Sequence, residues 1–384
     1  MSSFNFPNNP FDRFTQRGNT GGERRKVGPL PITIGALIVI IGILISLSGF
    51  YADVLWFRSV HFSSVWRTTL ATKAELFVLF GLATSLLVVA NVVIAYRRRP
   101  IYVPLTVEAD NVERYRAQLE PVRRYVVIAL GILFFWFSGL AGSQLWSQWL
   151  EFKNATPFGT KDPQFHLDIS FFAFKLPMYQ AVIGWAISAL LLTLIITTGV
   201  HYLYGGIRPA MREDRTTVTA RVQLSVLLGS IVLVKALAYW FDRYALELRQ
   251  GKLITGLSYT DVNATLPAKE ILAGIAVICA MLFFANIIRR SWVLPSVGVS
   301  LMIVSSLLIA GIYPAFIQQF QVKPSESTKE ATFIQRNIDA TRAAYGLTGV
   351  TVHDYQATTS VSSGQLAKDA QTVSNTRLDR KSVV

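Results

Sequence analysis

Charged residues and cysteine are both scarce in this chain of 384 residues. Asp, Glu, Lys and Arg make up 16% of it, against about 25% in an ordinary soluble domain. Several uncharged apolar stretches reach the length of about 18 residues that is typical of membrane spans. This pattern excludes a soluble globular enzyme and a disordered protein. Cys279 is the only cysteine, which also excludes a secreted domain held together by disulfides.

Sequence motifs for catalysis are lacking as well. The sequence has no phosphate-binding glycine loop, no Ser/His/Asp arrangement and no Cys-x-x-Cys pair. We therefore assign no catalytic, cofactor-binding or metal-binding residue, expect no cofactor and predict no enzyme activity. The net charge of +14 is compatible with nucleic-acid binding, but the basic residues stand between apolar segments, as they do in membrane proteins. The expected partner is the lipid bilayer, with no nucleic acid.

Seven apolar segments have the length of a membrane-crossing helix. At about 1.5 Å per residue, each can cross a hydrocarbon core of about 30 Å. The segments are residues 30–51, 76–96, 125–145, 179–201, 219–241, 271–288 and 292–312. The predicted fold is an all-α polytopic membrane protein. A bundle of seven transmembrane helices over residues 30–316 precedes a short, incomplete extracytoplasmic segment.

The distribution of basic residues predicts the orientation of the chain. With the amino terminus inside, the inner segments hold 18 Lys and Arg and the outer loops hold 10, and such an excess is typical of cytoplasmic loops. Residues 1–29 have few apolar side chains to pack, so we predict a disordered cytoplasmic tail. Seven spans then place residues 317–384 outside the cytoplasm. We expect a multi-pass protein of the plasma membrane, whose oligomeric state stays open.

The segment after the seventh span has the pattern of a domain that is only beginning. Ser327 and Glu330 have the spacing of a capping box. Apolar residues then recur at helical spacing as far as Gly346, a typical helix stop. Val350 and Val352 alternate with polar residues, which predicts a short strand. One helix and one strand cannot bury a core, so we expect the domain to be truncated.

Three polar side chains within the predicted spans form a candidate site. Lys235 is the only Lys, Arg, Asp or Glu well inside a span, and an ionisable residue there is a functional-site hypothesis by default. The alternative is a lysine stem that extends to the headgroups about 9 Å away. Asn91 and Asn286 are predicted to hydrogen-bond between helices, with contact to a substrate as the alternative.

Three glycines mark one face of the first span. Gly35, Gly42 and Gly49 repeat every seven residues, a period that returns to nearly the same face of a helix. We predict that this stripe lets a neighbouring helix approach closely, and a pore lining is the alternative. Replacement of Gly42 by leucine is then expected to lower stability or assembly.

The outer loop at residues 151–178 contains His166 together with Asp162 and Asp168. Imidazole and carboxylate groups both bind metals, but no second histidine is near in the sequence. We therefore predict a structured loop without a metal, in which Asp162 and Pro163 set a turn.

Three motifs resemble one bacterial family. Residues 50–57 read FYADVLWF, residues 158–165 read FGTKDPQF, and residues 333–338 read FIQRNI. These stretches are similar to uncharacterised protein family 0182, and the resemblance extends to about residue 377. It implies seven spans followed by a very large extracytoplasmic region, and it supplies no catalytic residue. Because residues 379–384 depart from the family, we expect an N-terminal fragment.

The predicted function is an envelope anchor or scaffold that presents an extracytoplasmic domain to protein partners in the cell envelope. The alternative is a transporter or channel subunit with a polar site near Lys235. Transporters place polar residues together near the midplane, often at broken helices. Here the spans are largely apolar, and Pro177 and Pro314 stand at predicted span ends. Three or more buried polar side chains at one depth around Lys235 would favour transport.

Overall fold

Helices account for most of the described chain. The computed structural model describes residues 29–100, 115–208, 215–251, 254–289, 293–354, 363–368 and 370–375. Within these ranges the extended pairings are isolated bridges, and no strand is formed. The all-helical prediction is therefore confirmed for the described residues. The predicted disordered tail lies outside them, except for Pro29, which begins a helix.

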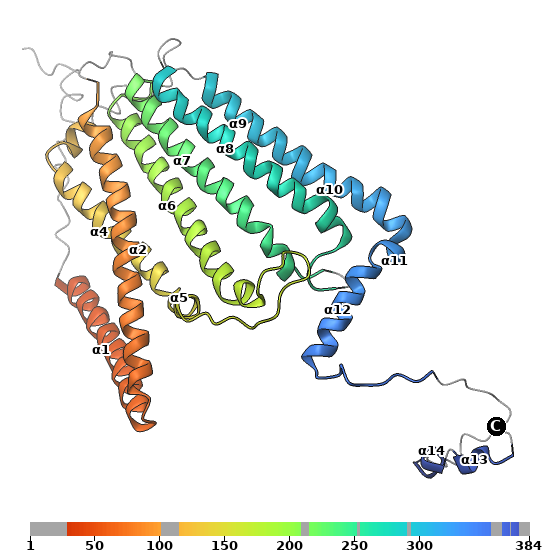
Figure 1. Ribbon diagram of the computed structural model, residues 1–384. Helices are drawn as coiled ribbons and strands as arrows, with labels where there is room; N and C mark the ends of the chain where they lie inside the picture. The colour runs from red at the N-terminus through yellow and green to blue at the C-terminus, as the bar shows by residue number, and fades with distance from the viewer. Residues whose placement is uncertain are drawn as a thin grey trace, which may run out of the picture. The chain divides into compact units, whose positions relative to one another are not determined.

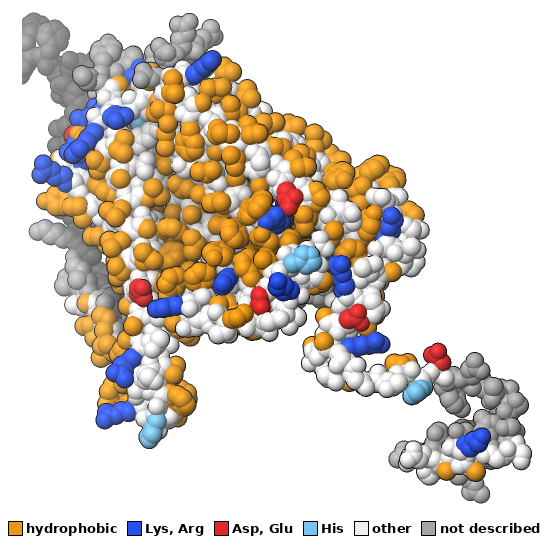
Figure 2. Space-filling view, viewed as in Figure 1, with side chains coloured by type: hydrophobic (Ala, Val, Ile, Leu, Met, Phe, Trp, Pro, Cys, Tyr) orange, Lys and Arg blue, Asp and Glu red, His pale blue; other side chains and the backbone are white. Residues whose placement is uncertain are grey.

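Seven helices are long and apolar enough to cross a membrane, and each overlaps one predicted span. They are α1 (Pro29–Ser59), α2 (Ser63–Arg97), α4 (Arg123–Ser143), α6 (Leu176–Leu203), α7 (Val218–Asp242), α8 (Leu266–Arg289) and α9 (Val293–Ser305) with its helical continuation to Lys329 (Figure 1). Apolar side chains cover much of the visible surface of these helices (Figure 2). Such exposed apolar faces suit a lipid environment.

The chain divides into two compact units. The first comprises Met1–Ile231 with Asn286–Ser291, and the second comprises Val232–Ala285 with Trp292–Val384. Helices α7 and α8 therefore contribute residues to both units.

In the first unit, α2 and α4 pack through contacts between glycine and aromatic residues. A Cβ atom at Gly139 of α4 would lie 2.8 Å from the ring and from the carbonyl oxygen of Phe77. Gly81 of α2 has the reciprocal position, because a Cβ there would lie 2.6 Å from the carbonyl oxygen of Phe135. Glycine thus allows the two backbones to approach more closely than any larger residue would permit.

In the second unit, α8 buries one face along most of its length. Leu272, Ala276, Cys279 and Phe283 are fully buried, and their spacing of three or four residues places them on one side of a helix. Gly298 of α9 adds to this packing, since a Cβ there would lie 3.3 Å from the Phe283 ring. The single cysteine, Cys279, is therefore a free thiol buried in this packing.

The π-helical turns of the described long helices each end two residues before a proline. They are Phe171–Lys175, Asp261–Thr265, Ser306–Ile312 and Ile317–Val322, which precede Pro177, Pro267, Pro314 and Pro324. Proline has no N–H to donate, and its ring collides with the carbonyl group four residues earlier in an α-helix. A wider turn relieves that collision. The last of the seven long apolar helices therefore continues beyond Pro314 to Lys329, and Pro177 lies inside a helix that begins at Phe171.

The helix expected after the seventh span is present as α12 (Ala331–Ala344). It ends just before Gly346, whose φ of 67° confirms this residue as the helix stop. The capping box predicted for Ser327 and Glu330 is wrong. Glu330 is the N-cap of α12 but makes no side-chain cap hydrogen bond, because its carboxylate accepts two hydrogen bonds from the backbone N–H of Tyr259.

The short strand predicted at Val350 and Val352 is also wrong. Both side chains are exposed, and the segment has no regular secondary structure. Alternating polarity favours a strand only where another strand is available to pair with it, and the described residues contain none.

Candidate functional site

Asn91 belongs to a chain of polar side chains that joins three helices of the first unit. Its side-chain oxygen and its backbone carbonyl accept hydrogen bonds of 3.1 and 2.9 Å from Nε2 of Gln223 on α7. The Gln223 Oε1 lies 3.0 Å from Nε2 of His201 on α6. His201 and Gln223 are both buried, so these bonds satisfy polar groups that would otherwise be costly within apolar helices.

Asn286 and Lys235 have contacts of their own. Asn286 Nδ2 donates a hydrogen bond of 2.7 Å to Ser225 Oγ, and both residues are almost fully buried in the first unit. In the second unit, the ammonium group of the half-buried Lys235 lies 4.8 Å from the centre of the Tyr239 ring. The three residues of the predicted polar site thus take part in three separate sets of contacts.

The predicted glycine stripe lies on an open face of α1. A Cβ atom at Gly35, Gly42 or Gly49 would meet no other atom within 4 Å. The apolar part of α1 is not buried by the rest of the described chain. Packing of the stripe against another helix remains a prediction.

The acidic residues of the loop at residues 151–178 hold its backbone in a fixed turn. Asp162 accepts hydrogen bonds of 2.9 and 2.5 Å from the backbone N–H groups of Gln164 and Phe165. Asp168 accepts bonds of 3.0 and 2.9 Å from those of Phe158 and Gly159. The predicted turn at Asp162 is therefore present. No group of three His, Cys, Asp or Glu in the described chain is placed to hold a metal ion.

The hydrogen bonds of Asp168 also set its pKa. The Ser170 hydroxyl, followed by the backbone N–H groups of Phe158 and Ser170, lowers the pKa of the Asp168 carboxyl from 3.8 to about 2. Each of these donors interacts more favourably with the charged carboxylate than with the neutral acid.

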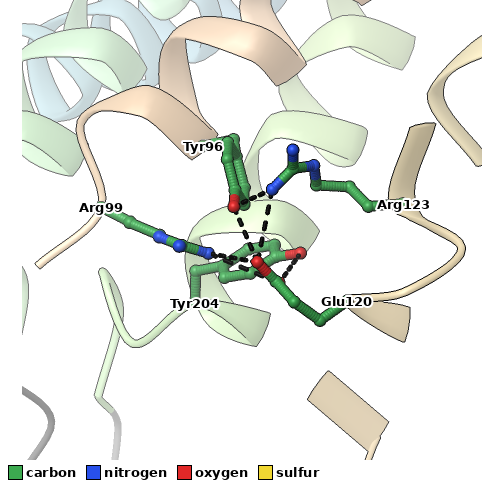
Figure 3. Close-up of polar contacts among 5 residues, drawn as sticks. All are labelled: Tyr96, Arg99, Glu120, Arg123 and Tyr204. Atoms are coloured by element: carbon green, nitrogen blue, oxygen red, sulfur yellow. Dashed lines mark hydrogen bonds and ion pairs between the residues drawn. The ribbon is translucent and has the colours of Figure 1, made fainter. Parts of the chain in front are cut away.

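Another acidic residue, Glu120, lies at the centre of a cluster in the first unit, which we call the Glu120 cluster (Figure 3). It consists of Glu120 with Tyr96, Arg99, Arg123 and Tyr204. The Glu120 carboxylate accepts bonds of 2.8 Å from the Tyr96 hydroxyl and 3.1 Å from Arg99. Arg123 lies 3.3 Å away, and the Tyr204 hydroxyl lies 3.4 Å away. The cluster ties the residues before α4 to the ends of α2 and α6.

Aromatic rings complete the Glu120 cluster. The guanidinium groups of Arg123 and Arg99 lie 3.9 and 4.2 Å from the centre of the Tyr96 ring, as expected for cation–π contacts. Burial, reinforced by the negative charge of Glu120, raises the pKa of the Tyr204 hydroxyl. Tyr204 therefore remains a neutral hydrogen-bond donor at physiological pH.

In the second unit, a buried carboxylate joins the helix after the seventh span to the loop between α7 and α8. We call this contact the Glu330 junction. The Glu330 side chain accepts hydrogen bonds of 3.0 and 3.1 Å from the backbone N–H of Tyr259. Lys329 donates a bond of 3.3 Å to the Tyr259 hydroxyl. Further along α12, Asn337 donates a bond of 3.0 Å to the carbonyl of Thr255.

The loop side of the Glu330 junction is itself held in place. Arg249 forms an ion pair of 2.9 Å with the buried Asp261, which also accepts a bond of 2.8 Å from the Ser258 hydroxyl. The backbone N–H of Gly256 donates to the carbonyl of Arg249 at 2.8 Å. Gly256 has a φ of 100°, a conformation that favours glycine. Thr260 also hydrogen-bonds Gln318 of the last of the seven long apolar helices.

Sequence patterns did not identify Glu330 or Gln223 as buried polar groups. Both stand where apolar segments begin or end, so polar character is expected there. Their partners lie 71 and 132 residues away in the sequence. The capping-box pattern was the one sequence signal that pointed to Glu330. It predicted that the Glu330 carboxylate accepts a hydrogen bond from a backbone N–H, but it named the wrong N–H.

The comparisons with known proteins agree on one family. The sequence model of the uncharacterised protein family UPF0182 matches residues 30–384. A UPF0182 protein of Frankia alni is 47% identical over 326 residues, which are 85% of this chain and 32% of that protein. A UPF0182 protein of Streptomyces coelicolor is 45% identical over 344 residues, which are 88% of this chain and 34% of that protein.

The chain spans about a third of the length of these curated relatives. No solved structure matches it significantly. Because the family model covers nearly all of its residues, the chain belongs to the uncharacterised protein family UPF0182.

Proposed function

We propose that this part of the protein is a membrane anchor that holds the segment after its seventh span in a fixed direction. The observation that carries the proposal is the Glu330 junction. If the segment after the last span were a flexible tether, it would make no hydrogen bonds to distant parts of the chain. Here the buried carboxylate of Glu330, at the start of the departing helix, accepts a bifurcated hydrogen bond from a backbone N–H 71 residues earlier in the chain.

Hydrogen bonds at two points along α12 favour a rigid junction rather than a single hinge. Glu330 fixes the start of the helix at Tyr259, and Asn337 fixes its next two turns at Thr255. Two attachments along one helix axis restrict its direction, whereas one attachment leaves it free to pivot. The loop that receives them is closed by the ion pair of Arg249 with Asp261.

The excess of basic residues on the opposite side supports a location of the Glu330 junction outside the cytoplasm. The anchor would then lie in the plasma membrane and present its exit helix to proteins of the cell envelope. The matched relatives are about three times as long as the matched segment. A fixed exit helix would orient further domains in proteins of that length.

Distance measurements between spin labels test this proposal. In a Cys279→Ala background, labels are attached at Gln250→Cys in the loop and Ala340→Cys in α12, both of which are exposed positions. A fixed junction predicts one narrow distance distribution in lipid nanodiscs. Glu330→Ala removes the acceptors for the Tyr259 N–H, so this distribution is expected to broaden. Asp339→Ala is the matched control, because it removes an exposed carboxylate from the same helix.

Two results would contradict a fixed exit helix. One is a broad distribution in the parent protein. The other is an unchanged narrow distribution in the Glu330→Ala variant, which would show that the direction of α12 does not depend on the junction.

A further inference from the structure

A groove opens beside the Glu120 cluster, between the ends of α2, α4 and α6 in the first unit. Its volume is about 440 Å³. Aliphatic side chains form most of its walls, among them Val93 of α2, Val127 of α4 and Leu203 of α6. Arg97 and Arg124 also line the groove, and both are exposed at the helix ends. The site therefore combines an apolar interior with two cationic groups.

Among the residues that the structure describes, the charges around this groove are not balanced. The Glu120 carboxylate is already shared by Arg99 and Arg123. Within the described ranges, the guanidinium groups of Arg97 and Arg124 make no ion pair or hydrogen bond. Two guanidinium groups at the edge of one groove, neither paired with an anion of the described chain, are complementary to a phosphate group, which accepts several hydrogen bonds from arginine.

The position of the groove favours a lipid over a soluble anion. It lies where three apolar helices end, the depth at which headgroups meet the hydrocarbon core. The aliphatic walls of the groove add no hydrogen bond to a small soluble phosphate held by the arginines, but they match an acyl chain. Basic pockets between transmembrane helices are known to bind anionic headgroups. A zwitterionic lipid would bring its own cation next to the arginines, whereas an anionic lipid neutralises them.

We propose that the groove between α2, α4 and α6 binds an anionic glycerophospholipid. Its phosphate lies between Arg97 and Arg124, and one acyl chain lies along Val93, Val127 and Leu203. The Glu120 cluster is a positioning element, because it draws the residues before α4 toward α2 and so keeps Arg124 near Arg97. This inference is independent of the Glu330 junction.

Native mass spectrometry of the detergent-solubilised protein, titrated with phosphatidylglycerol, tests the proposal. The double variant Arg97→Gln/Arg124→Gln is expected to bind about 25-fold more weakly, since each basic group near an anionic headgroup contributes roughly five-fold. The matched control is Arg58→Gln/Arg67→Gln, which removes two exposed arginines at the opposite ends of α1 and α2. It should bind phosphatidylglycerol as the parent protein does.

A second variant tests the groove with both arginines in place. Val127→Trp fills the apolar groove, and it is expected to weaken phosphatidylglycerol binding by about ten-fold while the protein remains monodisperse. Undiminished binding would show that the lipid lies elsewhere and would overturn the proposal. Equal affinity for phosphatidylcholine would overturn the role of charge. Competition by soluble glycerol phosphate at the same concentration would show that the site takes a free phosphate.

Discussion

At the scale of single residues, the Glu330 carboxylate is buried among groups that do not neutralise it. Burial raises its pKa above the ordinary value of 4.5, and the negative charges of Asp261 and Glu326 raise it further. The Tyr259 N–H acts in the opposite direction. The folded protein therefore holds the Glu330 proton more tightly than the unfolded chain does. This group stabilises the fold most below about pH 4.5, and the contribution is lost as the pH rises through the raised pKa.

Substitutions at Glu330 should separate its charge from its role as an acceptor. Glu330→Ala leaves the Tyr259 N–H without an acceptor, and the free energy of unfolding is expected to fall by about 1–3 kcal/mol. Glu330→Gln keeps an acceptor oxygen but has no charge, so its thermal midpoint should change less between pH 4.5 and 8 than that of the parent protein. Thermal unfolding in detergent measures both effects. A parental pH profile in Glu330→Gln would rule out Glu330 as the titrating group.

Asp168 has the opposite pH dependence. Its pKa of about 2 lies below the ordinary 3.8, so the folded loop holds this proton less tightly than the unfolded chain does. Its stabilising contribution is complete above about pH 3.8 and is lost as the pH falls toward 2. Hydrogen exchange at Phe158 and Gly159, corrected for intrinsic rates, should therefore increase in this window. Asp168→Asn should show faster exchange already at pH 7, and Glu151→Gln serves as the exposed control.

The residues of the candidate sites differ in how visible they are in the sequence. Asn91 and Asn286 stand out because they interrupt apolar segments, and the structure gives both of them interhelical hydrogen bonds. Gln223 and His201 lie near span ends, where polar residues are common. A buried polar residue there cannot be distinguished from an exposed one by sequence alone. The partners of a side chain are also set by tertiary packing, which no local pattern specifies.

At the scale of helices, glycine periodicity and glycine packing do not coincide. The regular stripe on α1 has open space beside it, whereas Gly81 and Gly139 lie against aromatic residues of a neighbouring helix. A periodic stripe indicates only that one face of a helix is small. Whether a helix occupies that face depends on the rest of the fold, or on another molecule.

A matched pair of alanine substitutions distinguishes the two kinds of glycine. Gly139→Ala places a Cβ 2.8 Å from Phe77, and such overpacking is expected to destabilise the protein by about 1–3 kcal/mol. Gly42→Ala adds the same atom in open space, so no loss is expected from contacts within the chain. Thermal unfolding of the two variants in the same detergent makes the comparison. Equal stability of the variants would contradict the close approach of α2 and α4.

The seven long helices were predictable because hydropathy is summed over about 20 residues, so one polar residue within a span changes the sum little. The ends of the helices were less predictable. Backbone hydrogen bonding continues through charged turns, as at the start of α2, and wider turns carry the last of the seven long helices past Pro314. Apolar composition reports where a membrane can lie, and it does not report where a helix stops.

At the scale of the whole molecule, the proposed orientation can be tested at the two ends of α2. In a Cys279→Ala background, Ser64→Cys and Arg98→Cys place exposed thiols at opposite ends of one helix. With the amino terminus inside, a membrane-impermeant maleimide should label Ser64→Cys in intact cells. It should label Arg98→Cys only after the membrane is opened. The reverse pattern would invert the topology and place the Glu330 junction in the cytoplasm.

The length of α2 has a practical consequence for imaging. Its 35 residues correspond to about 52 Å, which exceeds a hydrocarbon core of about 30 Å. The charged residues Arg67, Lys73 and Glu75 all lie in its first half, so the excess length falls at that end. There α2 meets α1 through the edge-on contact of Phe50 with Trp66, whose rings are 5.2 Å apart. A continuous helix that projects from a micelle is a natural point for a rigid fusion partner, which would give a 42.7 kDa membrane chain enough ordered mass for particle alignment in cryo-electron microscopy.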